Sequence, residues 1–238
     1  MKSWIFLVII LSAVLLSGCS QKTVSNDRNK STNIETKIRP QTQIQNRKTK
    51  WDRSVSKVRT VERPFFNISK NYHGITFNQF RYNNTYVVEA TILDFHKIKW
   101  VSNTPKTKMT VRIDRVISGN KSIEGKRLYL NFPGGFARER DIYTSSKGTI
   151  STTDPDKIIF YKIPNTPLPE IGSKIITGLR NDVKHVKQQF DSLYISDVEH
   201  TFWVKRNKRF ELNNPAFQTA NRSLDIFKLT DELNKNIK

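Results

Sequence analysis

The segment Thr85–Leu93 reads TYVVEATIL, and the segment Met109–Val116 reads MTVRIDRV. The first segment is rich in β-branched and aromatic residues and has no glycine or proline, whereas the second largely alternates apolar with polar residues. Both patterns are typical of β-strands, because successive side chains of a strand point to opposite faces of its sheet. These two segments therefore predict a β-rich fold.

Further short apolar segments follow, each ended by a turn rich in Gly, Pro or Asn, at residues 128–132, 158–161, 171–176, 193–204 and 210–212. Seven or eight short strands separated in this way predict a small antiparallel barrel or sandwich. Apolar residues from Leu224 to Ile237 then lie near helical spacing behind Ser223, a capping residue. The fold class is therefore mainly β, with a short C-terminal helix at about residues 222–237.

The N-terminus carries the pattern of an export signal. Met1–Ser3 contains a lysine, Trp4–Leu16 is an unbroken apolar run, and small residues follow at Ser17 and Gly18. A transmembrane helix needs about 20 apolar residues to cross the hydrocarbon core, and this run is shorter. The pattern predicts a signal peptide at residues 1–18, cleaved before Cys19.

The sequence Leu16-Ser17-Gly18-Cys19 is similar to the lipobox of bacterial lipoproteins. In that family a diacylglycerol is attached to the cysteine thiol, and cleavage leaves this cysteine as the first residue. The resemblance implies lipidation of Cys19 with palmitate-like chains, and thus a protein anchored on the cell membrane and facing outside the cytoplasm. An ordinary secretory peptide with a chance cysteine at the cleavage point is the alternative.

Cys19 is the only cysteine of the 238 residues. An intrachain disulfide and a zinc site made of several thiolates are therefore excluded. An exported protein without a disulfide must be stabilised by its core alone.

Residues 19–63 are polar and carry an excess of basic side chains over acidic ones. Such a composition buries too little apolar surface to offset the entropy of ordering. We therefore expect a lipidated N-terminus and a disordered basic tether at residues 19–63. Aromatic residues become frequent from Phe65 onward, which predicts a single folded domain at residues 64–238.

The order of the strand-like segments within residues 86–132 resembles the first three strands of small secreted OB-like barrels in bacterial envelope proteins. The chain departs from that pattern at Glu89-Ala90, where a glycine is frequent, and at Ser118, where a lysine precedes the turn glycine. The resemblance implies a barrel. It implies no ligand, because OB-like folds serve many functions.

The chain has 41 Lys and Arg against 21 Asp and Glu, a formal net charge of +20. Outside the cytoplasm, the polyanions within reach are phosphate-rich wall polymers, acidic lipid head groups and any free DNA. Export disfavours nucleic acid as the partner of so basic a chain. A solvated basic surface without specific binding is the simpler alternative.

One surface element concentrates this charge, at residues 203–210. Four cations flank Asn207, and asparagine tolerates the left-handed conformation that tight hairpin turns require. We predict a β-hairpin with a basic tip and a candidate polyanion-binding set consisting of Trp203, Lys205, Arg206, Lys208 and Arg209. The alternative is a solvated turn that deters edge-to-edge strand pairing.

No motif predicts catalysis, a cofactor or a metal site. The four histidines are scattered. Asp94 and His96 would lie on the same face of a strand. A strand end exposed to solvent is a simpler interpretation of this pair than a metal or acid–base site. Glu199 and His200 would point to opposite faces, which argues against cooperation between them.

The sequence therefore favours a lipid-anchored extracytoplasmic binding or interaction module over an enzyme. Its ligand is unknown, and docking on anionic envelope polymers is one candidate. A surface protein that recognises another protein, a peptide or a phage or conjugation component is an alternative, and it would require an aromatic hot spot. A hydrolase with an unrecognised site is the other alternative.

Overall fold

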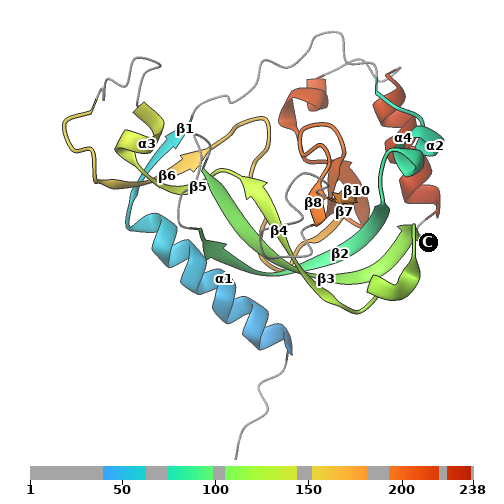
Figure 1. The fold of residues 1–238 in the computed structure, drawn as a ribbon, viewed down its shortest axis with the longest axis horizontal. Coiled ribbons are helices and arrows are strands. Elements are labelled where there is room, and N and C mark those ends of the chain that lie inside the picture. Colours follow the sequence, from blue (N-terminus) through green and yellow to red (C-terminus); the bar gives the residue numbers. More distant parts are fainter. Residues whose placement is uncertain are drawn as a thin grey trace, which may run out of the picture. The chain divides into compact units, whose positions relative to one another are not determined.

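The computed structural model describes residues 40–62, 74–98, 105–143, 152–181, 193–219 and 224–236. Its strands form two sheets (Figure 1). The larger sheet contains β2 (Tyr86–Lys97), β3 (Lys106–Ser118), β4 (Arg127–Pro133), β7 (Lys174–Asn181), β8 (Leu193–Ile195), β9 (Phe202–Arg206) and β10 (Arg209–Leu212). The smaller sheet contains β1 (Arg59–Glu62), β5 (Gly135–Arg138) and β6 (Ile158–Lys162).

Helices flank the two sheets. The α-helices in the described residues are α1 (Pro40–Ser56), α2 (Phe77–Tyr82), α3 (Glu139–Tyr143) and α4 (Asp225–Asn236), and two short 3₁₀ helices are η1 (Lys121–Ile123) and η2 (Pro215–Thr219). The mainly β fold with a C-terminal helix is thus confirmed. The strands β1 and β5 and the helices α1, α2 and α3 were not predicted from the sequence.

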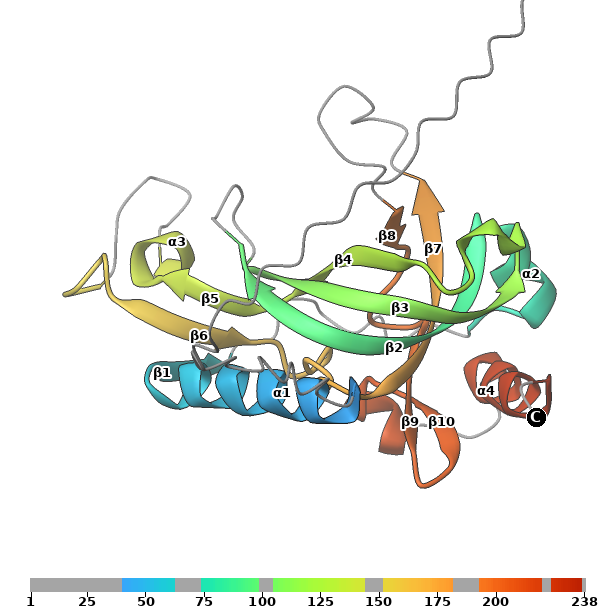
Figure 2. The ribbon, with the colours of Figure 1, turned by 90° about the horizontal axis from the view of Figure 1, so that it is seen from below.

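The larger sheet has the order β10-β9-β7-β2-β3-β4, with β8 paired to β7. The strands β2, β3 and β4 form an antiparallel meander. Then β7 returns to pair with β2, and β8 lies beside β4. Register shifts along the β2–β3 pair indicate bulges, which let these long strands bend (Figure 2). The sheet therefore curls rather than lying flat.

The strand β2 is buried on both of its faces. On one face, Val88, Ala90 and Ile92 lie in the main core, which extends to α1 and the smaller sheet. On the other face, Val87 lies in a second core shared with α2, α4 and the β9–β10 hairpin. A strand covered on both faces reads as a nearly continuous apolar run, which explains why residues 85–93 lack strict alternation.

A double glycine carries the chain from the larger sheet to the smaller one. Gly134 and Gly135, at the end of β4, have φ angles of 90° and 136°, which other residues rarely adopt. A Cβ on Gly135 would lie 2.4 Å from Oγ1 of Thr107. This junction allows β5, which follows β4 directly, to pair with β6 in the other sheet.

The structure differs from the predicted tether over residues 40–62, which belong to the folded body. Within α1 the side chain of Trp51 is buried, and its ring contacts Phe95, Phe136 and Phe160 edge to face at centroid distances of 5.2, 5.3 and 6.1 Å. The polar composition of α1 does not predict that Trp51 is buried, because its burial depends on partners far along the chain. Cys19, the signal peptide and Phe65 lie outside the described residues.

Replacing Trp51 with alanine should weaken the whole body. We expect Trp51→Ala to lower the free energy of unfolding by about 3–5 kcal/mol, because it leaves a cavity among three aromatic rings. Lys50→Ala, which changes the exposed neighbouring residue, should stay within about 0.5 kcal/mol of the unmodified chain. Urea denaturation of residues 20–238 followed by circular dichroism measures both. Equal midpoints for the two variants would show that α1 is not part of the core.

Candidate functional site

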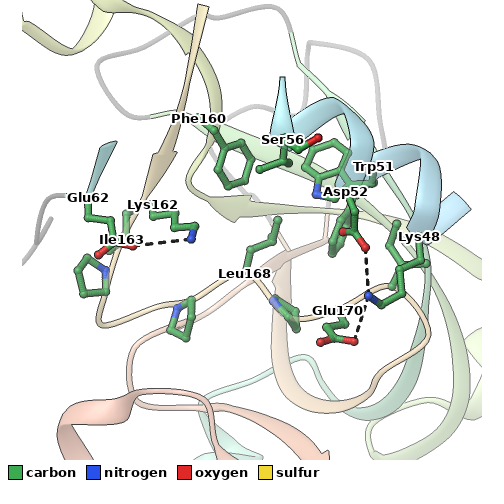
Figure 3. A pocket seen from close by; sticks show the side chains of 16 residues that line it. Lys48, Trp51, Asp52, Ser56, Glu62, Phe160, Lys162, Ile163, Leu168 and Glu170 are labelled. Atoms are coloured by element: carbon green, nitrogen blue, oxygen red, sulfur yellow. Dashed lines mark hydrogen bonds and ion pairs between the residues drawn. The ribbon is translucent and has the colours of Figure 1, made fainter. Parts of the chain in front are cut away.

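A groove of about 520 Å³ lies between α1 and the proline-rich segment that follows β6 (Figure 3). Its apolar lining comes from α1, from β2 and β6, and from the segment 163–171. The main apolar lining residues are Trp51, Val55, Phe95, Phe160, Leu168 and Ile171, joined by Pro164, Pro167 and Pro169. The sequence alone does not indicate this groove, because the polar composition of residues 40–56 predicts a tether.

The proline-rich wall of the groove is tied to the larger sheet. The amide of Gly172 donates to the carbonyl oxygen of Ile92 at 2.8 Å, and the amide of Ile92 donates to that of Ser173 at 3.0 Å. The buried side-chain amide of Asn213 donates to the carbonyl oxygen of Pro167 at 2.6 Å. Proline rings add stiffness, since they fix φ. The wall is therefore preorganised.

Ion pairs lie at two ends of the rim of the groove (Figure 3). At one end, Nζ of Lys48 lies 3.1 Å from Oδ2 of Asp52 and 3.5 Å from Oε2 of Glu170. The hydrogen bond and charge of Asp52, helped by Glu170, raise the pKa of Lys48 above its ordinary value. At the other end, Nζ of Lys162 lies 3.7 Å from Oε1 of Glu62. Two cations and three carboxylates give the rim one net negative charge on a strongly basic chain.

The groove has the composition of a binding site. Its hydroxyl group, that of Ser56, donates to the carbonyl oxygen of Arg53 within α1, and no described histidine lines it. The lining therefore brings together no nucleophile with a base among the described residues. A mostly apolar concave surface with a few charged groups is what ligand sites have in common.

The predicted basic hairpin is present. The strands β9 and β10 pair with Arg206 opposite Arg209, and Asn207 and Lys208 have φ angles of 47° and 70°. Positive φ at both central residues is the geometry of a tight two-residue hairpin turn. The structure brings the four predicted cations onto one hairpin.

These four cations do not act alike. The guanidinium of Arg206 donates to Oδ1 of Asn213 at 3.0 Å. Arg209 pairs with Asp231 of α4 at 2.9 Å. Lys205 lies over the ring of Phe210, with Nζ 5.6 Å from its centroid. Lys208 is exposed at the turn.

Trp203 is not part of the basic surface, and its prediction as a polyanion contact is wrong. Its side chain is fully buried in the second core, where its ring contacts Phe80 edge to face at 5.4 Å. Its indole Nε1 donates to Oγ1 of Thr230 in α4 at 2.9 Å. The helix α4 covers this face of β9, and the local sequence pattern does not predict that contact.

Asp94 and His96 lie on the same side of β2, as alternation predicts. Oδ2 of Asp94 lies 3.9 Å from Nε2 of His96 and 3.6 Å from Nε of Arg47 in α1. Nε2 of His96 also lies 2.9 Å from Oγ1 of Thr110. Among the described residues, no group of three or more His, Cys, Asp and Glu side chains is arranged to hold a metal ion.

Glu199 and His200 lie in a turn rather than in the regular strand that the sequence analysis assumed. Nδ1 of His200 lies 3.0 Å from Oδ2 of Asp197, and Oδ1 of Asp197 accepts the amides of Glu199 and His200. Burial acts to raise the pKa of Asp197, but the hydrogen bonds and charge of His200 outweigh it and lower this pKa. Burial raises the pKa of Glu199.

No described helix combines the length and the apolar character needed to cross a membrane. Comparisons with models of protein families, with curated protein sequences and with solved structures found no significant match. Function must therefore be argued from the residues of this chain.

The Asp197 turn should make stability depend on pH in opposite ways at two neighbouring carboxyl groups. A lowered pKa means that the ionised Asp197 stabilises the fold above about pH 4 and that this contribution is lost as the pH falls. A raised pKa means that the ionised Glu199 destabilises the fold at neutral pH. At pH 7 we expect Asp197→Asn to lower, and Glu199→Gln to raise, the free energy of unfolding.

Each effect should be no more than about 1 kcal/mol because solvent screens these partly exposed groups. Urea denaturation at pH 7 and pH 4 measures them. The Glu199→Gln difference should largely disappear at pH 4, where this carboxyl group is protonated, whereas the Asp197→Asn difference is lost only as the pH falls below about 4. Glu232→Gln, at an exposed position of α4, serves as the matched control. Shifts of the same sign for Asp197→Asn and Glu199→Gln would contradict this assignment.

Proposed function

We propose that this chain is a lipid-anchored binding module that faces outside the cytoplasmic membrane and holds an apolar peptide segment of a protein partner in the α1 groove. The lipobox-like N-terminus supports the anchor, and the groove supports the binding function. The single observation that carries the proposal is the groove itself, which is lined by aromatic residues and prolines and has ion pairs on its rim.

Rigidity of the lining supports recognition by this groove. Trp51 is held by three edge-to-face contacts, and the opposite wall is stiffened by prolines and tied to β2. A preorganised site loses little conformational entropy on binding, so apolar contact converts more fully into affinity. Aromatic anchors surrounded by a polar rim are the common arrangement of hot spots in protein interfaces.

Charge supports a neutral or basic segment as the ligand. The rim carries three carboxylates against two ammonium groups, so it attracts no polyanion. The contact is mainly apolar, and its affinity should therefore depend weakly on salt. This behaviour separates the groove from a surface that acts through net charge.

A peptide library displayed on phage and selected on residues 20–238 tests the groove. We expect the selected peptides to share adjacent apolar residues without acidic runs. Leu168→Lys should weaken binding of a selected peptide at least about tenfold, because it places a charge in the apolar lining, a change of about 1.4 kcal/mol. Isothermal titration calorimetry measures the dissociation constant, with Tyr82→Lys as the control at an exposed aromatic residue outside the groove.

Three outcomes would contradict the peptide proposal. They are no enrichment of apolar peptides, equal binding by the Leu168→Lys variant, and binding at the groove of the neutral dye N-phenyl-1-naphthylamine without any peptide enrichment. The last outcome would indicate a site for small apolar molecules.

The anchor is tested separately at Cys19. We expect the full chain, expressed in a bacterium, to incorporate labelled palmitate and to enter the detergent phase on Triton X-114 partition. Cys19→Ser should abolish both, because the thiol that accepts the lipid is gone, whereas Ser20→Ala should retain both. A Cys19→Ser variant that keeps the label would rule out this lipidation site.

A further inference from the structure

A second hollow, of about 620 Å³, lies between the basic hairpin and the C-terminal helix α4. Its polar lining consists of Lys205, Lys208 and Arg209 from the hairpin and Asp231, Asn234 and Lys235 from α4. Lys235 was not part of the set predicted from the sequence. We call the cavity that these residues line the hairpin–α4 hollow.

Asn234 fixes the two walls of the hollow against each other. Its Oδ1 accepts the amide of Phe210 at 2.8 Å, and its Nδ2 donates to the carbonyl oxygen of Phe210 at 2.9 Å. One side chain thus satisfies both backbone groups of Phe210 on β10, the edge strand of the sheet. With the Arg209–Asp231 ion pair beside it, the cations of the hairpin are held in place near Lys235 of α4.

The hollow is strongly positive. It has four cations and one carboxylate, and that carboxylate, Asp231, already pairs with Arg209. Lys205, Lys208 and Lys235 are exposed, and no carboxylate in the described part of the chain lies within ion-pair distance of them. Three ammonium groups around one concavity favour an anion with several charges that can enter it.

The side chains that line the hollow limit the kinds of anion that it can bind. Phe210 and Trp203 are buried, so they offer no face on which a base could stack, as binding of single-stranded nucleic acid requires. The exposed large apolar residues of the described chain are Tyr82, Tyr129, Ile158 and Tyr194, and none lines the hollow. The hollow therefore lacks the apolar side chains that insert into a bilayer.

We infer that the hairpin–α4 hollow binds a flexible phosphodiester-linked polymer through its backbone phosphates. Lys205, Lys208 and Lys235 supply the charge, while Asn234 and the Arg209–Asp231 pair position them. This site is separate from the α1 groove in its residues and opposite to it in charge. The inference thus extends the proposed function to a second ligand and does not depend on the first.

A synthetic poly(glycerol phosphate) oligomer is the probe, and residues 20–238 are the protein. Fluorescence anisotropy gives the association constant over a series of salt concentrations. The triple variant Lys205→Gln, Lys208→Gln, Lys235→Gln is compared with Lys50→Gln, Lys57→Gln, Lys106→Gln, which removes the same charge from exposed lysines outside the hollow.

We expect the hollow variant to bind at least about tenfold more weakly at low salt. Its slope of log K against log salt should be shallower by about 2, because each phosphate contact on a flexible chain contributes about 0.7. The control variant should keep the slope of the unmodified chain. Circular dichroism melts of both variants exclude loss of the fold as the cause.

Several results would overturn the inference. Equal losses in the two variants would show that the oligomer senses only net charge. Tighter binding to single-stranded DNA, or to vesicles of phosphatidylglycerol and phosphatidylcholine in equal parts, that depends on the same three lysines would assign the hollow to nucleic acid or to the membrane. Absence of binding to the oligomer at low salt would remove the site altogether.

Discussion

The structure depends on β2, which is enclosed on both faces and both edges. Its backbone pairs with β3 along one edge and with β7 along the other, so that Glu89 lies opposite both Arg115 and Ile176. The smaller sheet and α1 cover one face through the main core, and α2 and α4 cover the other through the second core. The flanking strands β3 and β7 pair the backbone groups of β2, which would be costly to bury unpaired, and the layers above and below it pack on its apolar side chains.

One charged residue, Glu89, lies in the buried part of this strand. The side chain of Glu89 is only 10% exposed, and its two oxygens lie 3.1 Å from Nζ of Lys174 on β7 and 3.6 Å from Nη2 of Arg115 on β3. A carboxylate in such a position needs cations, and these come from the two strands that flank it. Lys174 also lies 3.7 Å from Asp114, so the pairs join into a network that spans β3, β2 and β7.

The two candidate sites are built from different residues and use different physical forces. The groove beside α1 is apolar, with its charges paired at the rim, whereas most of the cations that line the hairpin–α4 hollow make no ion pair in the described part of the chain. Asn213 connects these regions, because it accepts a hydrogen bond from Arg206 of the hairpin and donates one to Pro167 of the groove wall. Arg206, one of the predicted polyanion contacts, thus serves to position the fold.

The sequence by itself determined the features that depend on neighbouring residues. The β class, the C-terminal helix and the turn at Asn207 follow from alternation, β-branched composition and local turn preference, all of which act over a few residues. The tertiary structure alone decided the recruitment of α1, the burial of Trp203 and the two cavities. Trp51 lies in a mostly polar helix and Trp203 lies in a strand that leads into a basic turn, and whether either ring is buried depends on which distant segment covers it. Those contacts join residues more than 25 positions apart, beyond the range in which a sequence pattern constrains the chain.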